Sequence, residues 1–162
     1  MYVPIKYLPK KLNSQDKKII KKELKKSRKA YKKGKYITRK KVKSFKSTKS
    51  QHIVNAERIY KIKNLRINNE LIKKTGCSAK SLNNIIKKGL GAYYSSGSRP
   101  NQTPHSWAYA RLASSISGGK ASAVDYNILL NGCLKNSKAL KLAKNARKKF
   151  GYGTRKVPKT KV

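Results

Sequence analysis

Apolar residues recur at helical spacing near the start of this chain. From Ile20 onward, the next apolar or small positions follow after four, three and four residues, which places them along one face of a helix. A helix over residues 14–33 is therefore predicted, with Lys on its other faces and Gly34 as its C-terminal stop. The residues of this narrow stripe are Ile20, Leu24, Ser27 and Tyr31.

Periodicity and capping residues predict helices through the rest of the chain as well. Thr103 is a candidate N-cap, and the Pro104 that follows it is favoured at a first helical position. Gly118 and Gly119 would end the helix that begins there. Further helices are predicted over residues 51–60, 121–131 and 134–149. The chain is thus predicted to be all-α: a small helical domain with extended, basic N- and C-terminal arms.

Residues 68–88 resemble a helix-turn-helix unit. Gly76 stands at the turn, Ser78 is placed to cap the second helix, and Gly89 to end it. One departure is Ile72, because the motif usually has a small residue there. A plain helical hairpin that touches no DNA is the simpler interpretation. In the helix-turn-helix interpretation, the second helix exposes residue types that reach base edges or phosphates: Lys80, Ser81, Asn83, Asn84 and Lys87.

The composition is strongly basic. The 162 residues include 43 Lys and Arg against five Asp and Glu, which gives a formal net charge of +38. Only three of the basic residues lie in residues 89–134. Because like charges repel and need hydration, we expect a tightly folded centre and flanks that meet nucleic acid, anionic lipid or acidic protein. The expected organisation is a basic arm over 1–50, a helical domain over 51–150 and a basic tail over 151–162, with the segment 89–131 at the centre.

The first 13 residues are predicted to form an extended part of this arm. Pro4 and Pro9 bias the residues before them to extended backbone, and apolar side chains stand between the two prolines. Such an arm can lie along the surface of a neighbouring protein. Its expected apolar anchors on that neighbour are Tyr2, Ile5, Tyr7 and Leu8.

Two segments carry residues suited to anions. Residues 35–50 mix basic residues with aromatic and aliphatic ones, which fits a phosphate backbone or an acidic protein groove equally well. Residues 89–101 offer hydroxyls and one guanidinium, as an anion-binding loop would, but lack the ending of a nucleotide P-loop. A rigid structural loop is the simpler interpretation of this second segment. The candidate residues for an anion or an acidic partner are Lys40, Lys41, Lys43, Lys46, Ser95, Ser96, Ser98 and Arg99.

The sequence offers no arrangement typical of an enzyme. It contains no paired-carboxylate motif, no nucleophile beside a base and no metal-ligand spacing, so no catalytic residue, metal, cofactor or small-molecule substrate is predicted. Asp125 is expected to pair with Arg99 or Arg111. For Cys77 and Cys133, free thiols in a reducing compartment are expected, with a bridge between them as the alternative. No apolar run has the length of a membrane span, and no signal peptide opens the chain.

The centre of the chain reads GAYYSSGSRPNQTPHSWAYARLASSISGGKASAVD. With the preceding stretches KKSRKAYKKGKYITRKKVKSFKSTKS and KKTGCSAKSLNNIIKKG, this signature resembles a small uncharacterised family from large DNA viruses of algae and amoebae. The resemblance covers residues 20–145 and implies no activity and no catalytic residue. It implies a context, namely a virion whose major capsid protein forms a lattice over an internal membrane. Minor capsid proteins hold that lattice together, and basic proteins are packaged with the genome.

These observations lead to one expected function and one main alternative. We expect a virion structural protein, a minor capsid protein that bridges capsomers on the inner side of an icosahedral shell through electrostatic contacts. Its partners would be the major capsid protein, other minor capsid proteins and an anionic inner membrane surface. The alternative is a basic DNA-binding protein that condenses the genome with the helix-turn-helix-like segment and the Lys-rich arms. A ribosomal-type RNA-binding protein is a third, less favoured interpretation.

Overall fold

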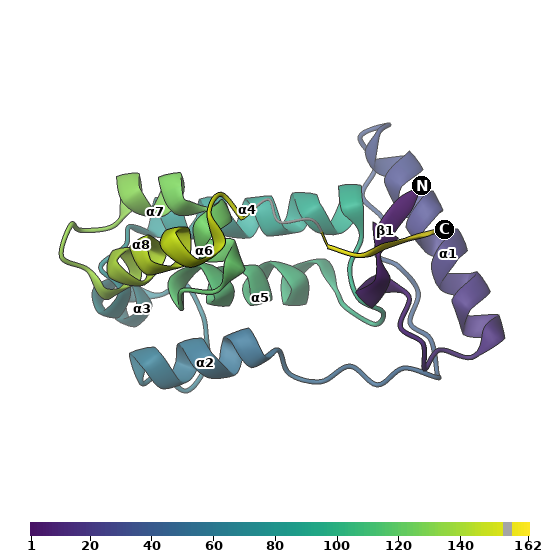
Figure 1. The fold of residues 1–162 in the computed structure, drawn as a ribbon, viewed down its shortest axis with the longest axis horizontal. Helices are drawn as coiled ribbons and strands as arrows, with labels where there is room; N and C mark the ends of the chain where they lie inside the picture. The colour runs from purple at the N-terminus through teal and green to yellow at the C-terminus, as the bar shows by residue number, and fades with distance from the viewer. Residues whose placement is uncertain (154–156) are drawn as a thin grey trace. The chain divides into compact units, whose positions relative to one another are not determined.

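The computed structural model describes residues 1–153 and 157–162, and most of their regular structure is helical (Figure 1). The prediction of a mainly helical protein is therefore confirmed. Two short strands are the exception. In chain order, the elements of these residues are β1 (Tyr2–Pro4), the 3-10 helix η1 (Ile5–Tyr7), α1 (Ser14–Tyr31), α2 (Gln51–Tyr60), α3 (Asn69–Thr75), α4 (Ala79–Ser96), α5 (Pro104–Ile116), α6 (Lys120–Val124), α7 (Tyr126–Gly132), α8 (Lys138–Phe150) and β2 (Lys159–Lys161).

The chain divides into two compact units. The first, which we call the strand unit, contains residues 1–48, 90–107 and 157–162 among those described. The second, which we call the disulfide unit, contains residues 49–89 and 108–153. The predicted extended arms are not confirmed. The first 48 residues pack instead with a segment of the predicted central domain.

Both ends of the chain lie in the strand unit. β1 pairs antiparallel with β2, with Val3 opposite Thr160, and the C-terminal Val162 is buried. Backbone hydrogen bonds from Ile5 N to Pro158 O and from Val162 N to Met1 O, both 3.0 Å long, extend this pairing. Residues 157–162 of the expected basic tail are therefore part of the strand unit. Residues 154–156 of that tail lie outside the described part of the chain.

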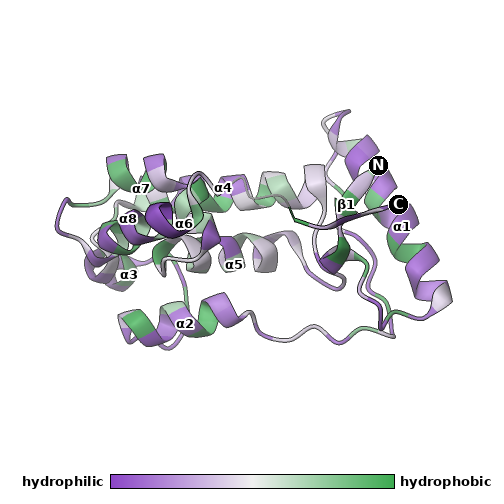
Figure 2. Ribbon diagram, in the orientation of Figure 1, coloured by the Kyte–Doolittle hydropathy of each residue, from purple (hydrophilic) through white to green (hydrophobic). Residues whose placement is uncertain are grey.

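The core of the strand unit forms around α1. Ile20, Leu24 and Ser27 of the predicted stripe are buried, and Figure 2 shows hydrophobic and hydrophilic residues alternating along this helix. The stripe faces the chain's own core. Two predicted partner anchors, Tyr7 and Leu8, belong to the same cluster and are only 7% and 6% exposed. The anchor prediction is wrong for these two residues, because the chain turns at η1 directly after β1 and packs them beside Leu24.

The disulfide unit contains a second hydrophobic core. α4 and α5 approach each other closely at Gly89, where a Cβ would lie 2.6 Å from the Cα of Ala108. The prediction that Gly89 ends a helix is wrong, because α4 continues to Ser96 and the glycine makes room for α5. The fully buried leucine and isoleucine side chains of this core are Leu71, Leu82, Ile85, Leu112, Ile116, Leu129 and Leu140.

Two predicted helices have different bounds in the disulfide unit. The helix predicted over 121–131 is broken at Asp125 into α6 and α7. The helix predicted over 134–149 begins only at Lys138, where the hydroxyl of Ser137 accepts a hydrogen bond from Leu140 N. The helix starts later than predicted because the chain is extended at Cys133, with φ −112° and ψ 149°.

Cys133 forms an isolated antiparallel bridge with Cys77, and the two residues are joined by a disulfide. Ser78 N donates to Gly132 O at 2.8 Å, and Leu134 N donates to Gly76 O at 2.9 Å. These flanking bonds leave the two cysteines as a non-hydrogen-bonded pair, in which side chains approach most closely. The expectation of free thiols is therefore wrong. The disulfide ties the turn after α3 to the end of α7.

Candidate anion-binding surface

The basic segment 39–46 is held in place through its backbone, by the two acidic residues of α1. Glu23 accepts a hydrogen bond from Lys40 N at 2.9 Å, and Asp16 accepts one from Ser44 N at 2.8 Å. The hydrogen bonds from Ser44 lower the pKa of Asp16. Asn101 adds two bonds to the backbone of Val42. Because the carboxylates bind peptide groups, the lysine side chains of this segment are left for solvent or a partner.

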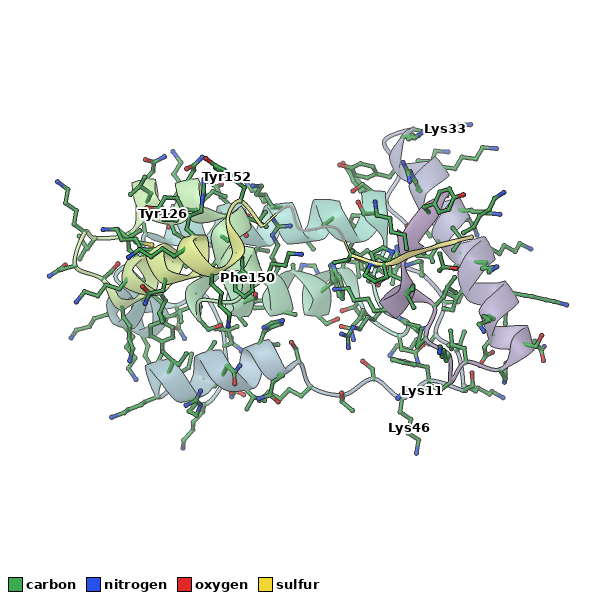
Figure 3. The ribbon with its side chains drawn as sticks, in the orientation of Figure 1. Lys11, Lys33, Lys46, Tyr126, Phe150 and Tyr152 are labelled. Atoms are coloured by element: carbon green, nitrogen blue, oxygen red, sulfur yellow. A yellow bond between two sulfur atoms is a disulfide. The ribbon has the colours of Figure 1, made fainter. Side chains whose placement is uncertain are left out.

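All four predicted lysines of this segment are exposed: Lys40, Lys41, Lys43 and Lys46. Figure 3 shows Lys46 projecting away from the ribbon. This arrangement suits contacts with an extended anionic partner, because backbone groups anchor the segment and the lysine side chains point to solvent. The sequence did not reveal the anchoring, although Asp16 and Glu23 stand seven residues apart, on one face of their helix.

Arg39, at the start of the same segment, is the one cation there that turns inward. It is 9% exposed, and its guanidinium donates to Ser27 Oγ at 3.0 Å, to Tyr93 O at 2.8 Å and to Ser98 Oγ at 2.7 Å. It also lies 3.7 Å from the centroid of the Tyr93 ring. Burial lowers the pKa of this group. Tyr93 O belongs to the last turn of α4, where the helix dipole favours a cation, so Arg39 caps that helix.

The predicted anion-binding loop divides between buried and exposed residues. Ser98 is 3% exposed, accepts from Arg39 and donates to Arg99 O at 2.8 Å, so its hydroxyl serves the fold. The prediction that Ser98 binds a partner is therefore wrong. Arg99 and Ser96 are exposed and Ser95 is half-buried, so these three remain candidates. Sequence reasoning missed Arg39, because the cation that completes this loop lies more than fifty residues earlier in the chain.

Two helices flank a turn at Gly76, since α3 ends there and α4 begins at Ala79. Gly76 adopts φ +73° at the end of α3, in the left-handed region that favours glycine. Lys80, Asn83 and Lys87 are exposed on α4, and Asn84 is half-buried. Ser81 is 4% exposed and donates to Ser78 O at 2.8 Å, so the prediction that it faces DNA is wrong.

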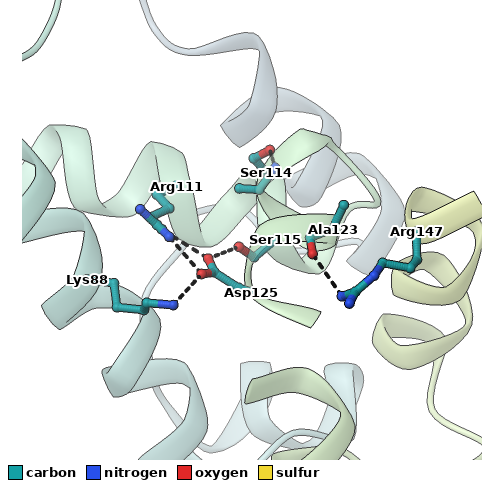
Figure 4. A network of polar contacts seen from close by, with 8 residues as sticks. Lys88, Arg111, Ser114, Ser115, Ala123, Asp125 and Arg147 are labelled. Carbon is teal, nitrogen blue, oxygen red and sulfur yellow. Dashed lines mark hydrogen bonds and ion pairs between the residues drawn. The ribbon is translucent and has the colours of Figure 1, made fainter. Parts of the chain in front are cut away.

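Asp125 is the centre of a polar network in the disulfide unit (Figure 4). Arg111 donates to both of its oxygens, at 3.0 Å and 2.7 Å, and Ser115 Oγ donates at 2.8 Å. Lys88 lies 3.4 Å away, and the Asp125 side chain has no exposed surface. The expected pair with Arg111 is confirmed. Because the carboxylate is enclosed and fully bonded, its role is to join α4, α5 and the α6–α7 break.

All five Asp and Glu side chains have a bonding partner within the chain. Asp16 and Glu23 bind backbone amides, while Glu57, Glu70 and Asp125 form ion pairs with Lys49, Lys74 and Arg111 respectively. Set against 43 Lys and Arg, these carboxylates leave the surface strongly positive. Such a surface attracts polyanions over a distance that shortens as salt increases.

Among residues 1–153 and 157–162, no group of three or more His, Cys, Asp or Glu is placed to hold a metal ion. Within the same residues, no helix is both long and apolar enough to cross a membrane.

Comparisons with known proteins give one relationship. No curated protein and no solved structure matches the chain. A family model does match it, over residues 4–131. This match spans most of the strand unit and much of the disulfide unit, and it includes the central signature. The chain therefore belongs to DUF5824, a family of unknown function.

Proposed function

We propose that this protein is a structural nucleic-acid-binding protein that neutralises phosphate backbones through its folded surface. The observation that supports this is the charge balance. Every Asp and Glu side chain already has a partner within the chain, and the formal net charge is +38. A polyanion supplies the missing negative charge, and release of its counterions drives the binding.

The burial of two of the four expected apolar anchors favours nucleic acid over a protein neighbour. A protein clamp needs apolar contacts for long residence, whereas electrostatic steering mainly raises association rates. Tyr7 and Leu8 lie in the chain's own core and cannot supply those contacts. Binding to phosphates requires only exposed cations. The chain supplies these in the lysines of residues 40–46 and in Lys80 and Lys87 on α4.

The proposed location is the virion. The resemblance to proteins of large DNA viruses suggests it, and the disulfide is compatible with it, because disulfides persist in virions and other oxidising environments. In that setting, the protein would lie against the packaged genome.

The test is the affinity of the oxidised protein for duplex DNA at increasing salt. Between about 50 mM and about 200 mM salt, we expect affinity to fall by roughly 10³-fold or more, because many phosphate contacts are neutralised together. Absence of binding at low salt, or affinity that does not change with salt, would contradict the proposal.

A matched pair of variants then tests the helix-turn-helix face. Lys80→Glu with Lys87→Glu reverses two exposed charges seven residues apart on α4. Lys141→Glu with Lys148→Glu does the same on α8. If α4 faces the duplex, the first pair weakens binding more than the second. Equal losses would remove the special role of α4 and leave general charge neutralisation.

A minor capsid protein is the second candidate. Tyr2 and Ile5 are 64% and 43% exposed and remain available as anchors on major or minor capsid proteins, beside an anionic inner membrane. Mild disruption of virions, followed by separation of shell and DNA core, distinguishes the two candidates. Recovery with the shell favours the capsid role, and recovery with the DNA favours the genome role.

A further inference from the structure

A hollow of about 480 Å³ lies in the strand unit, within the size range of small-molecule pockets. Three cations, Arg28, Lys32 and Lys159, stand around it together with the rings of Tyr2 and Tyr31. No Asp or Glu is among the described residues that line it. Its chemistry is therefore cationic and aromatic at once.

The fold brings these residues together from several elements. Arg28 and Tyr31 of α1, and Lys32 at its C-cap, follow at helical i, i+3 and i+4 spacing, so they share one face. In the two-stranded sheet, Tyr2 and Lys159 lie on the same side, because Pro4 is opposite Lys159 and side chains alternate along a strand. The C-terminal end of α4 adds the hydroxyls of Ser95 and Ser96.

The Tyr31 ring is held in place by other aromatic rings. Its plane is nearly parallel to that of Tyr94, at 8° with centroids 6.5 Å apart, and it meets the Tyr36 ring edge-on at 6.1 Å. A ring fixed in this way loses little freedom when a ligand stacks on it. Aromatic rings stack on nucleic-acid bases without regard to base identity.

A second hollow, of about 320 Å³, continues the basic surface. It shares Arg28 and Lys32 with the first and adds Lys25 and Lys29. Cations thus follow α1 from one hollow to the next. This arrangement suits a chain of phosphates better than a single phosphate.

We propose that the first hollow binds a nucleoside-phosphate unit of single-stranded nucleic acid. The base stacks against Tyr31 and Tyr2, and Arg28 and Lys32 bind the phosphates on either side. A base within a duplex is already stacked and cannot enter. The inference rests on the proposed nucleic-acid binding and adds to it a preference for unpaired strands.

The experiment measures binding of three probes to the full oxidised chain at fixed salt. They are a labelled oligothymidylate of about 12 nucleotides, a duplex of equal length and free thymidine monophosphate. Tyr2→Ala removes one stacking ring without changing charge, and because Tyr2 is 64% exposed, we expect little effect on stability. We expect affinity for the oligothymidylate to fall by about 5-fold or more and duplex affinity to stay the same.

A charge-matched comparison isolates the phosphate contacts. Arg28→Gln with Lys32→Gln removes two charges that line the hollow, in the last turn and at the C-cap of α1. Lys18→Gln with Lys22→Gln removes two exposed charges at the same spacing on α1, outside the hollow. The first pair should weaken oligothymidylate binding several-fold more than the second. Equal losses for the two pairs would overturn the inference.

The probes separate the inference from the proposed function. If the wild-type protein binds neither the duplex nor the oligothymidylate, the proposed function itself is contradicted. Duplex binding together with oligothymidylate binding that Tyr2→Ala leaves unchanged overturns the pocket alone. Tight binding of thymidine monophosphate, with no gain for the oligothymidylate, identifies a free nucleotide as the ligand and overturns the single-strand assignment.

Discussion

The buried guanidinium of Arg39 offers the sharpest test of how the strand unit is held together. In the Arg39→Ala variant, Ser27, Tyr93 and Ser98 each lose a charged hydrogen-bond donor, and the Tyr93 ring loses its cation. All of these groups are part of the fold, so stability should change even without a ligand.

The magnitude follows from what each partner retains. Hydrogen bonds to charged groups contribute about 1.5–3 kcal/mol, and a desolvated cation–π contact contributes about 1–2 kcal/mol. The losses are not additive, because Tyr93 O still accepts from Gly97 N at 3.2 Å and Ser98 Oγ still donates to Arg99 O. We therefore expect the free energy of unfolding to fall by about 3–4 kcal/mol, which is a large share of the usual 5–15 kcal/mol.

The chain has a built-in probe for this measurement. Its one tryptophan, Trp107, packs against the core of the strand unit, with its ring 5.7 Å from that of Tyr7. Tryptophan fluorescence during urea unfolding therefore reports on this unit, while far-ultraviolet circular dichroism reports on all helices. The fluorescence midpoint should move to lower urea in Arg39→Ala.

Two control variants make the result specific. Arg39→Lys keeps the charge but loses the planar fork, so an intermediate loss is expected. Arg99→Ala removes an exposed neighbouring charge and should change stability by no more than about 0.5 kcal/mol. If Arg39→Ala costs less than about 1 kcal/mol, the view that this residue caps α4 is refuted.

Three further predictions concern other bonds of the fold. Reducing the Cys77–Cys133 disulfide, which spans a sequence separation of 56, should lower the free energy of unfolding by up to about 4 kcal/mol in a urea titration with and without reductant; an unchanged midpoint would contradict it. Asp125→Asn should cost about 2–4 kcal/mol, measured in the same way, because it leaves partly buried cations without their carboxylate; a neutral result would exclude a structural role. Hydrogen bonds from Ser44 lower the pKa of Asp16, so its stabilisation is complete above the unfolded pKa and disappears as pH falls through the folded pKa. The stability difference between the wild-type protein and Asp16→Asn should therefore shrink on acidification, and a constant difference would refute the assignment.

Some residues of the candidate site could be predicted from the sequence and others could not. The exposed lysines of residues 40–46 and the exposed α4 residues could be predicted, since a surface charge needs no particular partner. Ser81 and Ser98 could not be assigned correctly, because their hydroxyls are taken up by neighbours within the chain. Arg28, Tyr31 and Lys32 share a helix face that the sequence shows, but the Tyr2 ring beside them comes from a distant segment.

The sequence by itself determined the local elements of this protein. Apolar spacing and end signals placed α1, α2 and the start of α5, and Gly76 marked the turn before α4. These signals act within a few residues, through side-chain direction, capping bonds and backbone freedom. The sequence also determined the net charge, on which the proposed class of partner depends.

Only the tertiary structure decided which distant residues meet. It joined the chain ends as β1 and β2, paired Cys77 with Cys133 and turned Arg39 inward onto α4. It also buried Tyr7 in the chain's own core rather than a neighbour's. Each of these contacts depends on the packing of whole elements, because a side chain's partner is set by what the completed fold brings next to it and not by the residues beside it in sequence.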